Sequence, residues 1–147
     1  MIRGVYLNTM NDDLTECKRI HQEVFESIDS VEAAFWNAND NEEEMAIYLL
    51  LFDENEVPIG TSRLIFDFDG MFQFDGLSVL PDFRKKGYGD FIMHMMFDKA
   101  YQSGAHYLVS NDACHMPEYF EKYGFKVENQ RLILDLKNYF NTHKCCH

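Results

Sequence analysis

A basic segment with two glycines, in the second half of the chain, limits the possible folds more than any other feature. Residues 84–89 read Arg-Lys-Lys-Gly-Tyr-Gly and lie between an apolar run that ends at Leu80 and a second that begins near Gly89. The start of a helix offers unpaired N–H groups and a partial positive charge, which together suit an anion. Glycines at 87 and 89 lack the Cβ atoms that would keep a phosphate away from the backbone. The segment therefore predicts a diphosphate-binding turn between a strand and a buried helix.

Two common phosphate motifs do not describe this segment. A P-loop requires G-x-x-x-x-G-K-[ST], which the chain lacks, and the dinucleotide fingerprint requires a third glycine where Ile92 stands. An exposed turn that is basic by coincidence is the other interpretation. The chain has 13 Lys and Arg against 25 Asp and Glu, so three basic residues in a row create a local positive potential that favours the anion site.

The pattern of apolar residues predicts strands and helices around this turn. Strands are expected over 2–7, 45–52, 59–68, 71–80 and 107–110, with two more strand pieces within 125–136. Helices are expected from the N-cap candidates at 11–13 to about 27, and over 31–37, 89–103 and 117–123. Asp69-Gly70 is typical of a hairpin turn between two of the strands. This order, β-α-α-β-β-β-α-β-α-β-β, predicts the α/β class, with a mixed sheet and helices on both faces.

Length and composition predict a single domain. The 147 residues are 46% hydrophobic, enough for one sizeable core, and no Pro/Gly/Ser-rich stretch divides the chain. We expect one domain over 1–140 and a frayed C-terminal tail over 141–147. The tail holds two histidines and two cysteines, but adjacent cysteines lack the spacing of a metal site, so no metal is expected.

The net charge and the lack of long apolar runs limit the partners and the cellular location that we expect for the protein. The net charge of −12 makes nucleic acid and anionic membrane surfaces poor partners and slightly favours a cationic substrate. No apolar run approaches the ~18 residues of a membrane span, no signal segment follows Met1, and the cysteines form no C-x-x-C pair. The chain is therefore expected in the cytoplasm.

Two motifs resemble those of a known family. The pattern Arg84-x-x-Gly87-x-Gly89, after a strand that ends Leu-Ser-Val-Leu-Pro at 77–81, is similar to the CoA-diphosphate signature of the GNAT (Gcn5-related N-acetyltransferase) family. Residues 119–125 read Tyr-Phe-Glu-Lys-Tyr-Gly-Phe and resemble the F-Y-E-K-x-G-F segment of that family. The order of expected elements also matches the family along essentially the whole chain. The resemblance implies the GNAT acyl-CoA N-acyltransferase fold, with splayed central strands, and an acetyltransferase that uses acetyl-CoA as co-substrate.

The same resemblance implies a cofactor site. In the family, pantetheine inserts between the fourth and fifth strands with strand-like hydrogen bonds, and the N–H of Val79 would hold the thioester carbonyl. Asn111 would hydrogen-bond the pantetheine arm or else cap the helix that follows. The other interpretation of 77–79 is an ordinary core strand. The full set implied at the cofactor is Leu77, Ser78, Val79, Arg84, Lys85, Lys86, Gly87, Tyr88, Gly89, Asp90, Asn111 and Phe120.

Asp75 is the candidate general base. It lies nine residues before the basic segment, where several family members carry a carboxylate, usually Glu, that takes the proton of the amine. Asp is one methylene shorter, so a bridging water or a bulge at Gly76 would be needed. Period-two alternation places Asp75 on one strand face with Gln73, Leu77 and Val79. The alternative is a structural Asp near the hairpin turn.

Tyr119 is the candidate acid for the leaving thiolate, and here the sequence departs from the family. The tyrosine of the family motif corresponds to Phe120, and Tyr119 precedes it by one residue. One residue rotates the side chain by about 100° around a helix, which turns Tyr119 away from the sulfur. Tyr123 and solvent are the other candidate acids, although Tyr123 is more typical of core packing.

The acceptor side is the least defined part of the sequence. Phe25, Trp36 and His115 are weak candidates for the acceptor pocket, with core packing or helix capping as the other role for each. His21 lies in the same region. The leading hypothesis is transfer of acetyl to a primary amine of a small molecule, by direct attack in a ternary complex. A GNAT-like module that binds acyl-CoA without catalysis is the alternative, and a homodimer through the terminal strands is a further expectation from the family.

Overall fold

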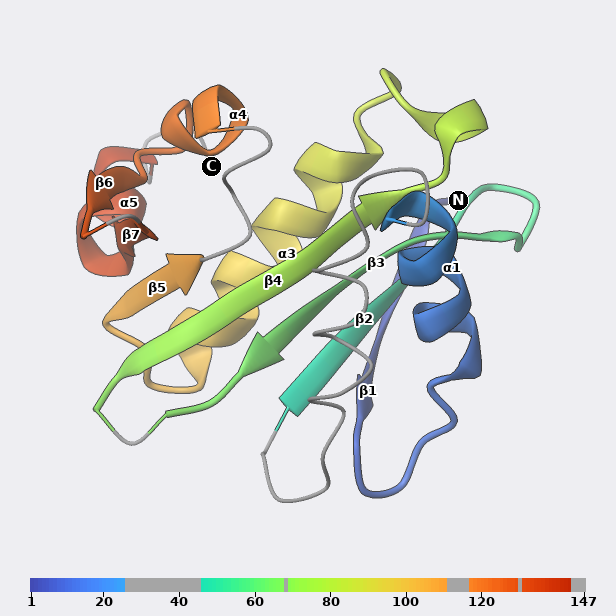
Figure 1. Ribbon diagram of the computed structural model, residues 1–147, viewed down its shortest axis with the longest axis horizontal. Helices are drawn as coiled ribbons and strands as arrows, with labels where there is room; N and C mark the ends of the chain where they lie inside the picture. The colour runs from blue at the N-terminus through green and yellow to red at the C-terminus, as the bar shows by residue number, and fades with distance from the viewer. Residues whose placement is uncertain (26–45, 68, 111–116, 130, 144–147) are drawn as a thin grey trace.

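The computed structural model describes residues 1–25, 46–67, 69–110, 117–129 and 131–143. In these residues seven strands form one sheet in the order β1-β2-β3-β4-β5-β7-β6 (Figure 1). All neighbouring strands are antiparallel except β4 and β5, which are parallel. The strands are β1 (Arg3–Asn8), β2 (Ala46–Phe52), β3 (Pro58–Ile65), β4 (Met71–Val79), β5 (Tyr107–Ser110), β6 (Lys126–Glu128) and β7 (Arg131–Asp135). The helices are α1 (Thr15–Phe25), α3 (Tyr88–Gln102), α4 (Pro117–Glu121) and α5 (Leu136–His143), and a 3-10 turn covers Pro81–Phe83.

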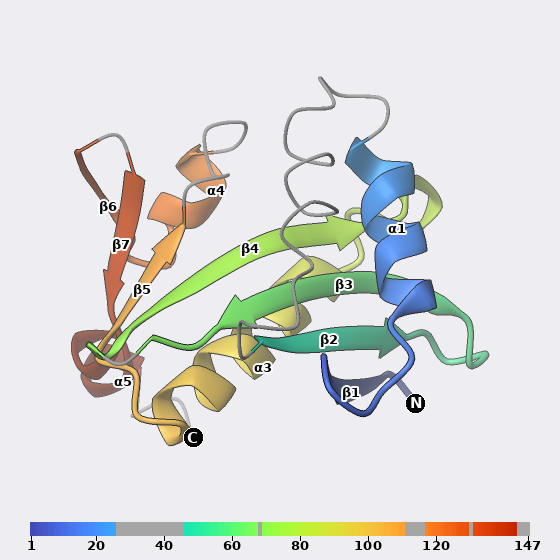
Figure 2. The same ribbon diagram turned by 60° about the horizontal axis from the view of Figure 1, so that its bottom comes forward.

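The expected mixed sheet with helices on both faces is confirmed. Figure 2 shows α1 on one side of the sheet and α3 on the other. β5 has the expected bounds, and α3 begins one residue before its expected start at Gly89. The helix expected over 31–37 lies outside the described residues. None of the helices in the described part of the chain has the length and apolar character needed to cross a bilayer.

One helix, α5, is absent from the sequence-based expectation. The alternation of Leu132, Leu134 and Leu136 continues the strand pattern, but β7 ends at Asp135 and α5 begins at the next residue. The Asp135 carboxylate accepts a hydrogen bond from the N–H of Asn138 at 3.1 Å, which caps the start of the helix. Residues 141–143, expected in a frayed tail, are therefore helical.

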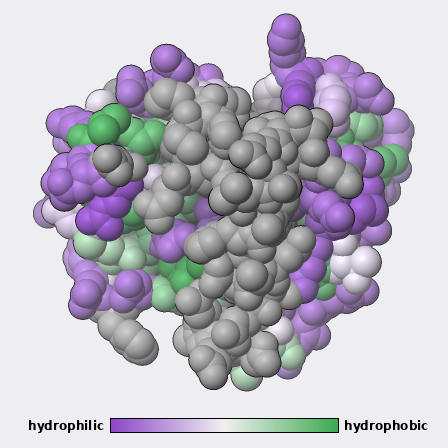
Figure 3. All heavy atoms as spheres, in the orientation of Figure 1, coloured by the Kyte–Doolittle hydropathy of each residue, from purple (hydrophilic) through white to green (hydrophobic). Residues whose placement is uncertain are grey.

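Two apolar clusters, one on each face of the sheet, form the core. On one face Met93, Met96 and Phe97 of α3 are fully buried against the sheet, which accounts for the nearly continuous apolar sequence of this helix. On the other face, Cys17 and Ile20 of α1 pack against β2. Outside the core, the coloured surface in Figure 3 is mainly hydrophilic, and its hydrophobic residues form small groups.

A bulge at Gly76 interrupts β4. Arg63 of β3 pairs with Asp75, whereas Thr61 pairs with Ser78, so β4 has one more residue than β3 between these two pairs. Gly76 has a φ of +70°, a left-handed conformation that a residue without Cβ adopts readily. The Ser78 hydroxyl donates to the Gly76 carbonyl at 2.9 Å and closes the bulge. The bulge named in the sequence-based expectation is therefore present.

The bulge changes which residues share a face of β4. Gln73 and Asp75 share a face, since the Gln73 amide donates to Asp75 Oδ2 at 3.1 Å. Leu77 and Val79 instead pack with Phe74 in the cluster on the α3 side. The expectation that Leu77 and Val79 share the face of Asp75 is wrong, because one extra residue shifts the period-two alternation by one position.

Asp75 and Arg63 form a buried ion pair on the α1 side. Arg63 Nε donates to Asp75 Oδ1 at 2.9 Å, and Nη2 donates to Oδ2 at 2.8 Å. The side chain of Asp75 is 7% exposed and that of Arg63 is 1% exposed. His21 of α1 and Tyr48 of β2 lie near the guanidinium. A bidentate pair is geometrically specific, so this one fixes the register of β3 against β4 beside the bulge.

Breaking the Arg63–Asp75 pair is expected to destabilise the fold. Asp75→Ala leaves a buried guanidinium without its carboxylate, and the free energy of unfolding should fall by about 3–5 kcal/mol. The double variant Arg63→Met with Asp75→Leu removes both charges and should recover most of that loss. Urea unfolding followed by circular dichroism measures both. A single variant within about 1 kcal/mol of the wild type would contradict a structural role for the pair.

Candidate active site

β4 and β5 separate after a short parallel pairing. Only Met71–Gln73 of β4 pairs with β5, opposite residues 107–109. Beyond Gln73 no strand in the described residues pairs with this edge, although β4 continues to Val79. Figure 2 shows the two strands diverging, with β7 and α4 on the β5 side of the opening. Within the described residues, this edge of β4 beyond Gln73 therefore has no partner strand, which is the arrangement that strand addition by an extended ligand requires.

The end of β4 presents backbone groups to this opening. Leu80 donates its N–H to the Ile59 carbonyl on β3 at 2.9 Å, and successive N–H groups point to opposite edges of a strand. The N–H of Val79 therefore faces away from β3, and so does that of Leu77. The side chains of Leu77 and Val79 are partly buried and pack against the apolar cluster on the α3 side, and the Ser78 hydroxyl is held within the bulge. Leu77 and Val79 can thus serve a ligand through their backbone, whereas the same alternation turns the N–H of Ser78 toward β3.

The basic segment forms a helix start without a side-chain cap, at the end of β4. Gly87 is the N-cap of α3, with a φ of +86°, and makes no side-chain capping hydrogen bond. The N–H groups of Tyr88, Gly89 and Asp90 in the first turn therefore have no acceptor within the helix. A Cβ on Gly87 would meet no atom of the described residues within 4 Å, so these residues leave space beside the turn. Unpaired N–H groups at the start of a helix are what anion sites use, so this turn remains the candidate diphosphate site.

The three basic side chains of this turn are exposed and have different neighbours. Arg84 Nε donates to the Val79 carbonyl at 3.0 Å and ties the turn to the end of β4. Lys85 has a φ of +63°, which is uncommon for a residue with a Cβ. Lys86 Nζ lies 5.7 Å from the centre of the Phe83 ring. Together they place positive charge at the start of α3.

A chain of polar side chains joins the first turns of α3 to α4 and α5. The Tyr123 hydroxyl donates to Asp90 Oδ1 and lies 3.4 Å from the Tyr119 hydroxyl. Asp90 Oδ2 is 3.3 Å from His94 Nε2, and His94 Nδ1 is 2.9 Å from the Tyr139 hydroxyl. Burial raises the pKa of Tyr119 and of Tyr123, so both hydroxyls stay protonated at neutral pH. Neither His94 nor Tyr139 carries a sequence signal, because their contact joins helices far apart in the chain.

Tyr119 and Phe120 occupy different environments. A Cβ built on Gly89 would lie 2.8 Å from the Tyr119 hydroxyl oxygen, so this hydroxyl rests against the first turn of α3. Phe120 is 3% exposed and packs edge-on against Phe74 and Phe125. Its side chain anchors α4 in the core, where it offers little surface to a cofactor.

The residues beneath α1 are buried. His21 is 2% exposed, so it packs in the core and does not line an open pocket. Burial, together with the positive charge of Arg63, lowers the pKa of His21 from 6.5 to about 3. The sequence patterns do not identify Arg63, which lies on the α1 side of the sheet. A lone arginine within the apolar run of β3 is the signal that could have found it, because a buried charge requires a partner.

Several of the expected site residues lie outside the described part of the chain. Trp36, Asn111 and His115 lie outside the described residues, and so does the side chain of Phe25 at the end of α1. The cysteines of the C-terminal tail also lie outside. Within the described ranges, no group of three or more His, Cys, Asp or Glu is arranged to hold a metal ion.

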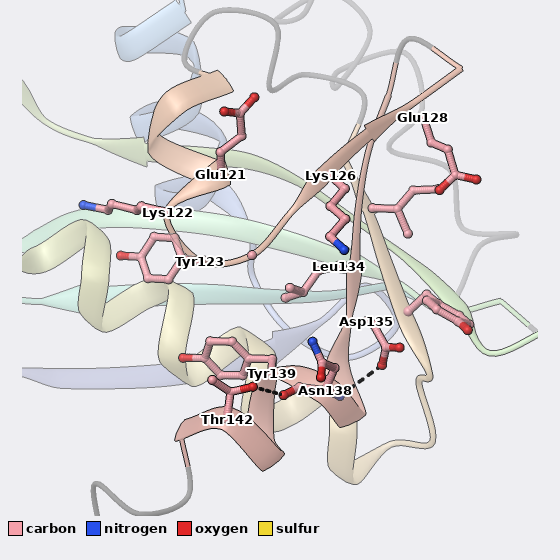
Figure 4. A pocket seen from close by; sticks show the side chains of 13 residues that line it. Glu121, Lys122, Tyr123, Lys126, Glu128, Leu134, Asp135, Asn138, Tyr139 and Thr142 are labelled. Carbon is pink, nitrogen blue, oxygen red and sulfur yellow. Dashed lines mark hydrogen bonds between the residues drawn. The ribbon is translucent and has the colours of Figure 1, made fainter.

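A hollow of about 360 Å³ lies between α4, the β6–β7 hairpin and α5. Figure 4 shows Tyr123 and Tyr139 on the α3 side of the hollow, with Lys126, Asp135 and Asn138 along the rest of it. The lining mixes both signs of charge and includes no residue of β4 or of the basic turn. The candidate active site is therefore the opening beside β4, and not this hollow.

Comparison with known proteins finds the same arrangement elsewhere. A sequence model of the acetyltransferase (GNAT) family matches residues 7–125. An acetyltransferase of the GNAT family from Staphylococcus aureus has a TM-score of 0.69 at 14% identity, over 92% of this chain and 99% of its own. A Brucella melitensis GNAT family acetyltransferase, solved with acetyl-CoA, gives 0.70 at 16% identity, over 90% and 88% of the two chains. The PaiA N-acetyltransferase of Thermoplasma acidophilum, solved with coenzyme A, gives 0.67 at 17%, over 90% and 96%. These structural likenesses concern the fold, and no curated protein matches the chain.

Stability is expected to depend on pH through His21. Its pKa is about 3 in the folded protein and about 6.5 in the unfolded chain, so the unfolded chain takes up the proton first as pH falls. The stability that neutral His21 contributes is complete above pH 6.5 and is lost between about pH 6.5 and 3, at up to ~1.4 kcal/mol per pH unit. His21→Gln does not titrate and should therefore lose less stability than the wild type on acidification. Urea unfolding of both proteins from neutral pH to about pH 5 tests this, and parallel pH curves would contradict it.

Proposed function

The chain belongs to the acetyltransferase (GNAT) family, and on this premise we propose that it moves the acetyl group of acetyl-CoA to a primary amine of a small molecule. The observation that carries the proposal is the helix start at Gly87, which has no side-chain cap and lies at the end of the open edge of β4. A diphosphate would find helix N–H groups there, and its extended arm would find a strand edge. The complexes of the Brucella and Thermoplasma proteins with acetyl-CoA and coenzyme A support the same cofactor.

The arm of the cofactor would run along the open edge of β4. Arg84 ties the diphosphate turn to the carbonyl of Val79, so Val79 lies at the diphosphate end of this edge. Pantetheine contains two amide groups and spans roughly four extended residues, which brings its sulfur nearer to Gly76 than to Val79. We therefore assign the N–H of Val79 to an amide carbonyl of the arm. The N–H of Leu77 then takes the thioester carbonyl.

The proposed reaction is direct attack in a ternary complex. The neutral amine attacks the carbonyl carbon of the thioester and forms the new C–N bond. The N–H of Leu77 stabilises the charge that develops on the carbonyl oxygen. The C–S bond then breaks, CoA leaves as the thiolate, and the extra proton of the amine nitrogen passes to water, from which the thiolate can take one. The net charge of −12 would attract a cationic amine to the enzyme, and that amine must lose a proton before it can attack.

Asp75 is our candidate for accepting this proton, through a bridging water. Both of its carboxylate oxygens accept a hydrogen bond from Arg63, and Oδ2 also accepts one from Gln73, so the bridging water would share the carboxylate with these donors. The same ion pair favours the second candidate function, a module that binds acyl-CoA without catalysis. Arg63 and Gln73 already occupy the carboxylate, and a purely structural Asp75 would look the same.

Release of free thiol measures the proposed reaction. The wild type with acetyl-CoA and a panel of primary amines is expected to release CoA thiol only when an accepted amine is present. Asp75→Asn should lower kcat by about 100-fold more than Arg63→Met, since both break the ion pair and only Asp75 would carry the proton. Equal losses in the two variants would remove Asp75 from the mechanism. Tight CoA binding without thiol release for any amine would favour the binding module.

Gly87→Val is expected to weaken CoA binding. A side chain at this position would project into the open space beside the turn and hold the diphosphate away from the N–H groups. We expect the dissociation constant for CoA to rise more than about tenfold, because hydrogen bonds to a charged group are lost. Isothermal titration calorimetry with CoA provides the measurement.

Gly104→Val is the matched control for this variant. Gly104 also has a positive φ, +99°, and nothing within 4 Å of a built Cβ, but it follows the other end of α3. The two variants should therefore share a similar loss of stability, while only Gly87→Val loses affinity for CoA. Equal affinities in both would contradict the diphosphate site.

A further inference from the structure

Tyr119 lies at the diphosphate end of the proposed cofactor site. Its hydroxyl oxygen would be 2.8 Å from a Cβ on Gly89, and Gly89 belongs to the first turn of α3. The lack of a side chain at Gly89 is what permits this approach. The thioester, in contrast, is assigned to the bulged part of β4. The hydroxyl is thus close to where the phosphates would bind, and not to where the sulfur would.

The neighbours of Tyr119 leave its hydroxyl proton available to a ligand. Tyr123 has a single hydroxyl proton and donates it to Asp90, which also contacts His94. The oxygens of Tyr123 and Tyr119 are 3.4 Å apart, at the outer limit of a hydrogen bond. Because burial raises the pKa of Tyr119, the residue remains a donor at neutral pH.

The surroundings of Tyr119 also favour an anion. Lys122 Nζ lies 4.4 Å from the centre of the Tyr119 ring, so a cation accompanies the hydroxyl on α4. The hydroxyl also rests against Gly89, at the positive end of α3. Asp90 is the nearby negative group, and the hydroxyl of Tyr123 donates to its carboxylate.

We propose that Tyr119 binds the cofactor, by donating a hydrogen bond from its hydroxyl to a diphosphate oxygen, and that Tyr123, held by Asp90, positions it. The inference rests on the proposed function, because it requires the diphosphate at the first turn of α3. Tyr119 keeps its proton throughout and does not serve as the acid for the thiolate. The order Tyr119-Phe120 explains the change of role. Phe120 occupies the position of the family's tyrosine and is buried in the core, so the hydroxyl is displaced toward α3.

Tyr119→Phe, with two acetyl donors, tests this role. The dissociation constant for CoA is expected to rise about tenfold, as one hydrogen bond to a charged group is lost. With acetyl-CoA, kcat/KM should fall by a similar factor through KM, while kcat changes little. Acetyl-pantetheine lacks the diphosphate, so the variant and the wild type should use it equally well. Tyr101→Phe, which removes an exposed hydroxyl near the other end of α3, is the matched control and should resemble the wild type with both donors.

Two further binding measurements need no amine acceptor. One tests the positioning role of Tyr123, and the other tests the diphosphate contact of Tyr119. In Tyr123→Phe, Asp90 loses the proton of Tyr123 and competes for that of Tyr119. This variant should therefore bind CoA more weakly but bind acetyl-pantetheine, which lacks the diphosphate, as well as the wild type does. Inorganic pyrophosphate should displace CoA from the wild type at lower concentration than from Tyr119→Phe.

The outcomes separate this inference from the proposed function. An equal loss with acetyl-CoA and acetyl-pantetheine would show that the hydroxyl acts at the thioester and would overturn the inference. An unchanged dissociation constant for CoA would overturn it too. If either result is found while the wild type binds CoA and releases thiol, only the role of Tyr119 fails. If the wild type does not bind CoA, the proposed function fails and the inference fails with it.

Discussion

The parallel pairing of β4 with β5 is the constraint on which the rest of the structure depends. Because β5 runs in the direction of β4, the chain must cross the sheet between them, and α3 makes that crossing. The crossing begins at the carboxyl end of β4, which places the positive end of a helix beside the end of that strand. Within the described residues β5 then pairs with three residues of β4, and the rest of that edge has no partner strand. A diphosphate with an extended arm matches both features at once. Two antiparallel strands joined by a hairpin would offer neither.

The extra residue at Gly76 places Asp75 on one face of β4 and the apolar residues Leu77 and Val79 on the other. Without it, period-two alternation would put Asp75 on the same face as Leu77 and Val79, and a carboxylate would have to lie within an apolar cluster. With it, the carboxylate reaches Arg63 on the α1 side while the two apolar side chains fill the α3 side. The ion pair also requires the bulge, since the register of Arg63 against Asp75 differs from that of Thr61 against Ser78. Packing and electrostatics therefore select the same irregular strand.

Local patterns in the sequence predict the order of elements and the helix start, but not the contacts made across the fold. Glycines and basic residues at 84–89 predict the helix start that the structure has at Gly87, because a turn and a helix start are set by neighbouring residues. The anion site at this turn stays a prediction. The leucines at 132, 134 and 136 continue a strand pattern past the point where Asp135 caps α5, so this helix has no periodic signal at its start. Arg63 meets Asp75 only after β3 and β4 align around a bulge. The contact of His94 with Tyr139 likewise joins α3 and α5, which are distant in the sequence.

The order Tyr119-Phe120 bears on which step of acetyl transfer the protein must assist. Phe120 has no proton to give, and the hydroxyl of Tyr119 rests against Gly89. An alkyl thiol such as that of cysteine has a pKa of about 8.5, so a thiolate is a stable leaving group near neutral pH and can take its proton from water after it departs. An amine differs, because its ammonium form has no lone pair with which to attack. A donor beside the sulfur can therefore be lost at small cost, whereas removal of the amine proton cannot. In the proposed mechanism that demand falls on Asp75, on the α1 side of β4, and not on α4.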